Sequence, residues 1–186
     1  MKDYEEVRQK AKEGDAEAQN KLGLMYEQGR GVDQNDKEAV KWFKKAAEQG
    51  VLGAQFNLGN MYEYGLGVAK DYEEALCWFR KAADQGHVRA QYSLGWMYQY
   101  GKGVEEDYGE AIKWYEKAAD QGYEEAQDSL GLIYEQGLGV PQDDEKAVEW
   151  FKKAADQGHE DAQENLRQMY EQGRGVTKDD KTAGDR

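Results

Sequence analysis

Residues 54–89 read AQFNLGNMYEYGLGVAKDYEEALCWFRKAADQGHVR, and variants of this stretch follow one another with a period of 36 residues and no insertion. The opening pairs are Ala18-Gln19, Ala54-Gln55, Ala90-Gln91, Ala126-Gln127 and Ala162-Gln163. Four of the five tryptophans follow the same period, as Trp42, Trp78, Trp114 and Trp150. A fixed period of this length indicates stacked supersecondary units. We therefore expect one repeat domain over residues 1–186, with full repeats at 18–53, 54–89, 90–125 and 126–161.

The second half of each repeat predicts an amphipathic helix. Ala39, Trp42, Phe43 and Ala46 are spaced i, i+3, i+4 and i+7, which places them on one helical face. Gly50 follows as the residue best able to end a helix in the left-handed conformation. A capping-box pattern starts the same helix in the pairs Asn35 with Glu38, Asp71 with Glu74, and Asp107 with Glu110, whereas Asp143 with Lys146 keeps only the cap.

The first half of each repeat predicts a second helix. Ala18, Leu22 and Tyr26 are spaced i, i+4 and i+8, and a Gly-x-Gly turn follows them. A glycine also lies inside this helix, as Gly23, Gly59, Gly95 and Gly131. Each costs about 1 kcal/mol of helix propensity relative to alanine. A repeated cost predicts a repeated reason, and we expect that the missing side chain leaves room for a neighbouring aromatic ring.

The ends of the chain depart from the repeat pattern. Residues 1–17 align with a second helix, but Glu6 stands at the tryptophan position and Lys10 at the first paired-alanine position. This favours a solubilised N-terminal capping helix. A partial fifth repeat and tail cover 162–186, where Arg167 replaces the helix glycine and a further helix is predicted near Asp180.

The repeat unit resembles the Sel-one-like repeat (SLR), a 36-residue relative of the tetratricopeptide repeat. The residues that carry the resemblance are Leu58, Gly59 and Tyr62, then Gly65, Gly67 and Val68, then the run from Ala75 to Ala83. The resemblance implies an all-α, right-handed solenoid of antiparallel helix pairs, used as a protein-protein interaction scaffold or adaptor without catalytic residues. Cysteine-rich relatives lock each repeat with a disulfide, which a chain whose only cysteine is Cys77 cannot do.

Composition excludes several other classes of protein. The net charge of −13 argues against nucleic acid or an anionic membrane as a partner. No apolar run is long enough for a membrane span or a signal peptide, so the sequence as given favours a cytoplasmic location, although a removed signal would leave no trace. Cys77 and the two histidines, His87 and His159, form no motif, and we expect no catalytic residue, no metal and no cofactor.

Candidate binding residues come from the first helix of each repeat, which we expect to line the concave surface. Positions equivalent to 20, 24 and 28 form one stripe, and aromatic residues gather in its second and third repeats. Trp96 stands where other repeats have Leu, Asn or Gln, so packing does not demand a large ring there. The predicted partner-binding residues are Trp96, Tyr64, Tyr100, Asn60, Phe56, Tyr92, Asn57, Ser93 and Leu132. Phe56 and Tyr92 have a competing interpretation, in which they pack one repeat against the next.

The sequence leaves other functions open. A chain with no insertions and nearly identical repeats is also typical of an idealised or engineered repeat protein with no specific partner. We expect a monomer, with end-to-end self-association through Leu166, Met169 and Tyr170 as the alternative.

Overall fold

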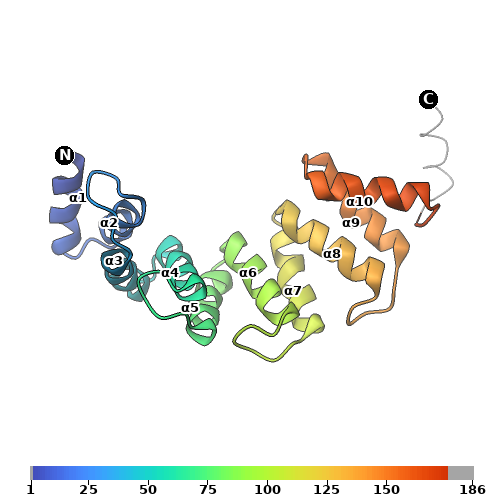
Figure 1. Ribbon diagram of the computed structural model, residues 1–186, viewed down its shortest axis with the longest axis horizontal. Coiled ribbons are helices and arrows are strands. Elements are labelled where there is room, and N and C mark those ends of the chain that lie inside the picture. Colours follow the sequence, from blue (N-terminus) through green and yellow to red (C-terminus); the bar gives the residue numbers. More distant parts are fainter. Residues whose placement is uncertain (1, 176–186) are drawn as a thin grey trace. The chain divides into compact units, whose positions relative to one another are not determined.

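The computed structural model describes residues 2–175, and all regular structure in that range is α-helical (Figure 1). The helices are α1 (Lys2–Lys12), α2 (Ala16–Gln28), α3 (Asp36–Glu48), α4 (Leu52–Tyr64), α5 (Tyr72–Asp84), α6 (Val88–Gln99), α7 (Tyr108–Ala119), α8 (Glu124–Gln136), α9 (Asp144–Asp156) and α10 (Glu160–Glu171). The predicted all-α class and the two helices per repeat are confirmed.

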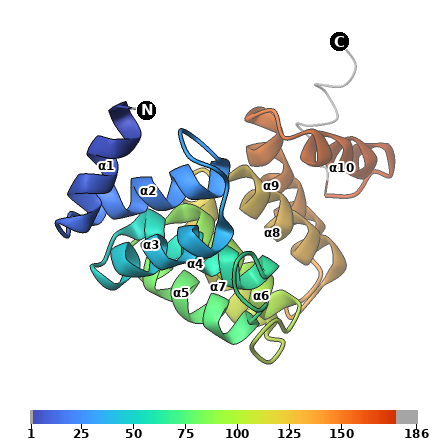
Figure 2. The same cartoon turned by 60° about the vertical axis from the view of Figure 1, so that its left-hand side comes forward.

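The chain forms two compact units. The N-terminal unit comprises Met1–Met97 and Lys102–Glu105, and the C-terminal unit comprises Tyr98–Gly101 and Glu106–Arg186. In the first unit α1 packs against α2, α2 against α3, α3 against α4 and α4 against α5. In the second unit α7 packs against α8, α8 against α9 and α9 against α10 (Figure 2). Packing between sequence neighbours is the arrangement that stacked repeats require.

The apolar face of each second helix forms the core, as its spacing predicts. Ala39, Phe43 and Ala46 are fully buried, and their equivalents in later repeats are buried too. The tryptophans are less uniform, because Trp78 and Trp114 are buried while Trp42 and Trp150 are half-buried. In every repeat the lysine three residues later covers the ring, with its Nζ 4.3, 3.8, 3.7 and 3.7 Å from the ring centroid in repeat order.

The glycine inside the first helix has the packing role that the sequence predicts. A Cβ on Gly23 would lie 2.6 Å from ring atoms of Phe43, and one on Gly59 would lie 2.5 Å from Phe79. Gly131 faces Phe151 in the same way. The absent side chain therefore allows the two helices of a repeat to approach with an aromatic ring between them.

The capping-box prediction is correct for the cap and wrong for its reciprocal half. Asp71 Oδ1 accepts from the amides of Glu73 and Glu74 at 3.0 and 3.1 Å. The Asp71 amide, however, donates to the carbonyl of Tyr62 in the preceding helix at 3.0 Å. The cap amides of Asn35, Asp107 and Asp143 likewise donate to the carbonyls of Tyr26, Tyr98 and Tyr134. Since a tyrosine carbonyl satisfies each amide, Lys146 can replace glutamate at no cost to the cap.

A chain of glutamine contacts links successive repeats, and the sequence pattern does not reveal it. The buried Gln55 donates from Nε2 to the Ala47 carbonyl at 3.3 Å and accepts from Gln85 Nε2 at 2.9 Å. Gln19 and Gln127 make the same two kinds of contact, with Ala11 and Gln49, and with Ala119 and Gln157. At these three Ala-Gln pairs the glutamine therefore supplies hydrogen bonds to two other helical segments, while the alanine supplies a buried methyl group.

The terminal helices show how the repeats end. In α1, Val7 and Ala11 are buried, and Tyr4 Oη lies 3.0 Å from Tyr26 Oη. This hydrogen bond and burial raise the pKa of Tyr26 to about 12.

At the other end, the predicted apolar patch needs correction. Met169 belongs to the core at 1% exposure, Leu166 is half-buried against the same cluster, and only Tyr170 is exposed. The helix predicted near Asp180 lies outside the described residues.

Candidate partner-binding face

Two neighbouring first helices of the N-terminal unit carry the predicted binding residues. Phe56, Asn60 and Tyr64 lie one turn apart along α4, and Tyr92 and Trp96 lie one turn apart along α6. We call these five residues the aromatic face. The opposite side of each helix belongs to the core, where Leu58, Met61, Leu94 and Met97 are fully buried. The core therefore fixes which side of α4 and α6 remains available to a partner.

The aromatic face is partly open to solvent. Tyr64 is 64% exposed at the end of α4. Phe56, Asn60, Tyr92 and Trp96 are half-buried, so each leaves only part of its surface accessible. Trp96 therefore both contacts its neighbours and presents part of its side chain to solvent.

Phe56 takes part in packing between repeats. Its ring stacks on His87 with 4.6 Å between centroids and contacts Phe79 at 5.7 Å with the planes tilted. The His87 ring precedes α6, so the stack holds the start of α6 against α4. These contacts support the packing interpretation of Phe56 and leave its exposed edge beside the other residues of the aromatic face.

The polar residues beside the face differ in availability. Asn57 Nδ2 donates to Asn20 Oδ1 at 3.4 Å, so this amide already links two repeats. Ser93 is half-buried in α6. Asn60 is therefore the amide of α4 that remains for a partner.

The C-terminal unit holds the remaining predicted residues. Tyr100 is 52% exposed, and Leu132 is half-buried against the core cluster of α9. At the position of Phe56 and Tyr92 this unit has Asp128, which is buried and accepts from Asn165 Nδ2 at 3.0 Å. Burial raises the pKa of the Asp128 carboxyl. A buried, hydrogen-bonded carboxylate thus replaces the aromatic ring, and the first helices of this unit present a different chemistry.

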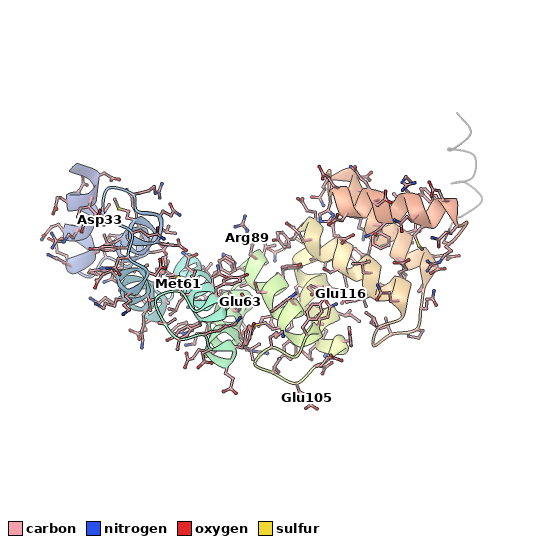
Figure 3. All side chains as sticks on the ribbon, in the orientation of Figure 1. Asp33, Met61, Glu63, Arg89, Glu105 and Glu116 are labelled. Atoms are coloured by element: carbon pink, nitrogen blue, oxygen red, sulfur yellow. The ribbon has the colours of Figure 1, made fainter. Side chains whose placement is uncertain are left out.

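Charge is almost absent from the helices of the aromatic face. The only carboxyl or cationic side chains in α4 and α6 are those of Glu63 and Arg89. Glu63 is 9% exposed, and burial raises the pKa of its carboxyl. Arg89 is exposed, and its side chain points away from the helices (Figure 3). In a chain with a net charge of −13, these two helices therefore present a single exposed formal charge, which is positive.

Sequence reasoning missed Arg89, although the repeat register contains the signal. The equivalent positions hold Glu17, Gly53, Glu125 and Asp161. Acidic residues suit the first turn of a helix, because the N-terminal end of the helix dipole is positive. Arg89 is the only cation at this position and opposes that preference.

His87 fixes the start of α6. Its Nδ1 accepts from the Ala90 amide at 3.2 Å, which makes it the N-terminal cap. His159 caps α10 in the same way, through the Ala162 amide at 3.1 Å. Burial, with the nearby Arg89 charge, lowers the pKa of His87. Both histidines therefore serve the fold as hydrogen-bond acceptors.

An open hollow lies in the N-terminal unit where α2 and α4 begin. It has a volume of about 690 Å³, and its lining includes Asn20, Gln49, Leu52, Gly53 and Gln85. Leu52 is 36% exposed there. The hollow gives this unit a concave, largely uncharged surface built from first helices and the turns that precede them.

Residues 2–175 contain no group of three or more His, Cys, Asp or Glu side chains that could hold a metal ion. Cys77 is exposed on α5. Within the same range no helix combines the length and the apolar content needed to cross a membrane.

Comparison with known proteins agrees with the fold. The family model of the Sel1 repeat matches residues 16–51, 53–87, 88–123, 124–159 and 161–183. A Sel1 repeat protein from Oxalobacter formigenes is 41% identical, with a TM-score of 0.85 over 89% of this chain and 68% of its own. No curated protein sequence is significantly similar to the chain.

Two further solved structures, both of bacterial proteins, are similar to the chain. A protective antigen of uropathogenic Escherichia coli strains with an SLR fold is 38% identical, with a TM-score of 0.83 over 95% of this chain. The match spans 46% of that antigen. Helicobacter pylori cysteine rich protein B is 26% identical, with a TM-score of 0.56 over 67% of this chain and 92% of its own. Sel1 repeat proteins form a family of non-enzymatic scaffolds that mediate protein–protein interactions.

Proposed function

Because the chain belongs to the Sel1 repeat family, we propose that it is an interaction scaffold whose first helices bind a protein or peptide. The aromatic face of the N-terminal unit, centred on Trp96, is the proposed contact surface. The observation that carries the proposal is the concentration of partly exposed aromatic rings on two helices that carry almost no charge.

Aromatic residues in such positions suit partner binding. Tyrosine and tryptophan combine a large apolar area with a polar atom and few rotatable bonds, and they dominate the energetics of many interfaces. The fold does not require a ring at position 96, because the equivalent residues are Leu24, Asn60, Leu132 and Gln168. A residue that the repeat does not need is a better candidate for binding than one that every repeat shares.

The C-terminal unit contributes its own candidates to the proposal. Tyr100 is exposed beyond the end of α6, and Leu132 occupies the position of Trp96 in α8. Asn57 and Ser93 support the proposed surface as polar residues beside Phe56 and Tyr92.

A comparison of two repeat-consensus substitutions tests the proposal. Trp96→Leu installs the residue that two other repeats carry, and Tyr72→Asp does the same at the start of α5, where Asp36 and Asp144 are the equivalents. Wild type and both variants are cross-linked in lysate of the native host, and the recovered proteins are quantified by mass spectrometry. We expect Trp96→Leu to deplete the partner recovered by wild type and Tyr72→Asp to retain it.

The same experiment distinguishes the proposed scaffold from a repeat protein that has no specific partner. Equal recovery of the same proteins by Trp96→Leu and wild type would remove Trp96 from the binding surface. Repeated recovery of no enriched protein by wild type would favour a repeat protein without a specific partner. Thermal unfolding of each variant is measured alongside, and a loss of folded protein in Trp96→Leu would assign the ring to the core.

A further inference from the structure

Arg89 is a cation at the positively polarised end of its own helix. It is the second residue of α6, next to the positive end of the helix dipole, and it lies two residues from the cap His87. A cation there is less favourable than the acidic residues that three other repeats place at this position. A residue that is locally unfavourable, and that makes no intramolecular contact to compensate, is a candidate for a functional role.

Arg89 makes no compensating polar contact with the other described residues. No hydrogen bond or ion pair joins its guanidinium to any residue in the range 2–175, and the side chain is exposed. Arg174, by contrast, donates to Asp144 at 2.8 and 3.1 Å and to Glu135 at 2.9 Å. The guanidinium of Arg89 therefore keeps its donors available for an external acceptor.

The position of Arg89 connects it to the aromatic face. Arg89, Tyr92 and Trp96 are spaced i, i+3 and i+7 and share one side of α6. The stack of Phe56 on His87 brings α4 to the same end of α6. A partner that contacts these rings therefore also lies close to the guanidinium of Arg89.

We propose that the segment bound by the aromatic face is an acidic, apolar peptide whose Asp or Glu side chain pairs with Arg89 while its apolar residues contact Tyr92 and Trp96. The inference rests on the proposed function and specifies the chemistry of the partner. Charge complementarity supports it, because Arg89 supplies the only exposed formal charge on α4 and α6. An arginine fork also matches the two oxygens of a carboxylate.

The first helices of the C-terminal unit have the opposite character. In α8 and α10 the acidic residues are Glu124, Glu125, Asp128, Glu135, Glu160, Asp161, Glu164 and Glu171, and Arg167 is the only cation. Arg167 already pairs with Glu164 and Glu171. An acidic segment would be repelled by these helices, so the inference assigns it to the N-terminal unit alone.

The test uses the full chain and a defined set of peptides. Immobilised 12-residue peptides with both ends blocked carry a central Glu, Gln or Lys, flanked by positions that vary among Leu, Phe, Ser and Asn. Binding of purified wild type, Arg89→Gln and Arg89→Glu is measured at fixed ionic strength. Lys44→Gln is the matched control, because it removes an exposed charge from α3 in the same unit.

We expect wild type to bind the Glu peptides about tenfold better than the Gln peptides, which is the lower end of what a hydrogen bond to a charged group contributes. Arg89→Gln should reduce that ratio to about one, and Arg89→Glu should reverse the preference toward the Lys peptides. Lys44→Gln should leave the ratio unchanged. The unfolding temperature of Arg89→Glu should equal or exceed that of wild type, because glutamate suits the first turn of α6.

Several results would overturn the inference. They are the absence of a Glu preference in wild type, a preference that survives Arg89→Gln, or a fall in unfolding temperature in both Arg89 variants. Binding that is lost in Trp96→Leu yet insensitive to Arg89 would leave the proposed function standing without this partner chemistry.

Discussion

The ring of Phe79 lies directly against the backbone of Gly59, so a Cβ on Gly59 would stand 2.5 Å from Cε1 of that ring. Real Cβ atoms do not approach a neighbour so closely, and neither Gly59 nor Phe79 has room to move, because both are fully enclosed in the core. The contact explains why a helix accepts a glycine that lowers its own propensity.

Gly59→Ala is therefore expected to destabilise the protein, although alanine is the better helix former. The propensity gain of about 1 kcal/mol is offset by overpacking of typically 1–3 kcal/mol, so we expect a net loss of up to about 2 kcal/mol. Urea unfolding followed by circular dichroism measures the change. Gly53→Ala is the matched control in the same helix, because its Cβ would meet only Asn20 Nδ2, at 3.4 Å. A more stable Gly59→Ala protein would show that the ring can move aside.

The same contact shows how far the sequence determines the fold. The 36-residue spacing predicts both helices of every repeat, and the repeated cost of glycine predicts the aromatic ring above it. The glutamine contacts escape prediction because Gln55 and Gln85 lie 30 residues apart within one repeat, so their pairing depends on how the two helices of that repeat pack. The reciprocal capping bond fails for the same reason, since the Tyr62 carbonyl competes for the Asp71 amide only in the folded chain.

The candidate site, too, can be predicted from the sequence only in part. Helical spacing groups Phe56, Asn60 and Tyr64 on one side of α4, and Tyr64 is exposed in the structure. It does not reveal that the Asn57 amide is engaged by Asn20, because that contact joins two repeats. Arg89 differs from the equivalent residues of the other repeats, but it lies outside the stripe formed by the positions equivalent to 20, 24 and 28.

Gln55→Glu is expected to destabilise the protein strongly at neutral pH. The side chain is 4% exposed, so a carboxylate there would be buried without the donor that now serves the Ala47 carbonyl. A loss of about 2–3 kcal/mol follows from the desolvation of the charge. Because burial raises the pKa of such a carboxyl, part of the loss should be recovered as the pH falls and the group is protonated. Urea unfolding at pH 7 and pH 5 checks this, with the exposed Gln28→Glu as the control; a control that loses as much stability would contradict it.

The N-cap formed by His87 predicts a loss of stability in mild acid. Burial lowers the pKa of His87, so the unfolded chain binds a proton more readily than the folded one, and the stabilising contribution falls as the pH drops below the ordinary value of 6.5. Protonation also removes the lone pair that accepts from Ala90.

His87→Asn supplies a cap that does not titrate, so its stability should fall less between pH 7 and pH 5 than that of wild type. The difference should be about 1 kcal/mol, the usual contribution of a cap. Denaturant unfolding at the two pH values measures it, and nuclear magnetic resonance titration of the imidazole reports the pKa directly. Parallel pH profiles for the two proteins would exclude His87 as the cause.

At Leu66 the N-terminal unit lacks the ion pairs that Arg174 makes at the equivalent position of the C-terminal unit. Arg174 lies between the glycines of the fifth turn and binds Asp144 and Glu135. Three repeats earlier the same positions hold Leu66, Asp36 and Glu27, so both acceptors are present without the cation. Burial raises the pKa of the Glu27 carboxyl, and the charge of Asp36 raises it further. Leu66 itself is 39% exposed.

Leu66→Arg is therefore expected to stabilise the N-terminal unit at neutral pH. The new guanidinium would place a positive charge between two carboxylates whose repulsion now opposes the ionisation of Glu27, and a gain of about 0.5–1 kcal/mol is reasonable for a partly exposed pair. The gain belongs to the ionised carboxylates, so it should be complete at pH 7 and should disappear as the pH falls through their pKa values. Urea unfolding at pH 7 and pH 3.5 tests both parts, with Leu138→Arg as the matched control, because Tyr108 stands there in place of Asp36. An equal gain in the control, or a gain that persists in acid, would show that the charge on Glu27 and Asp36 is not its source.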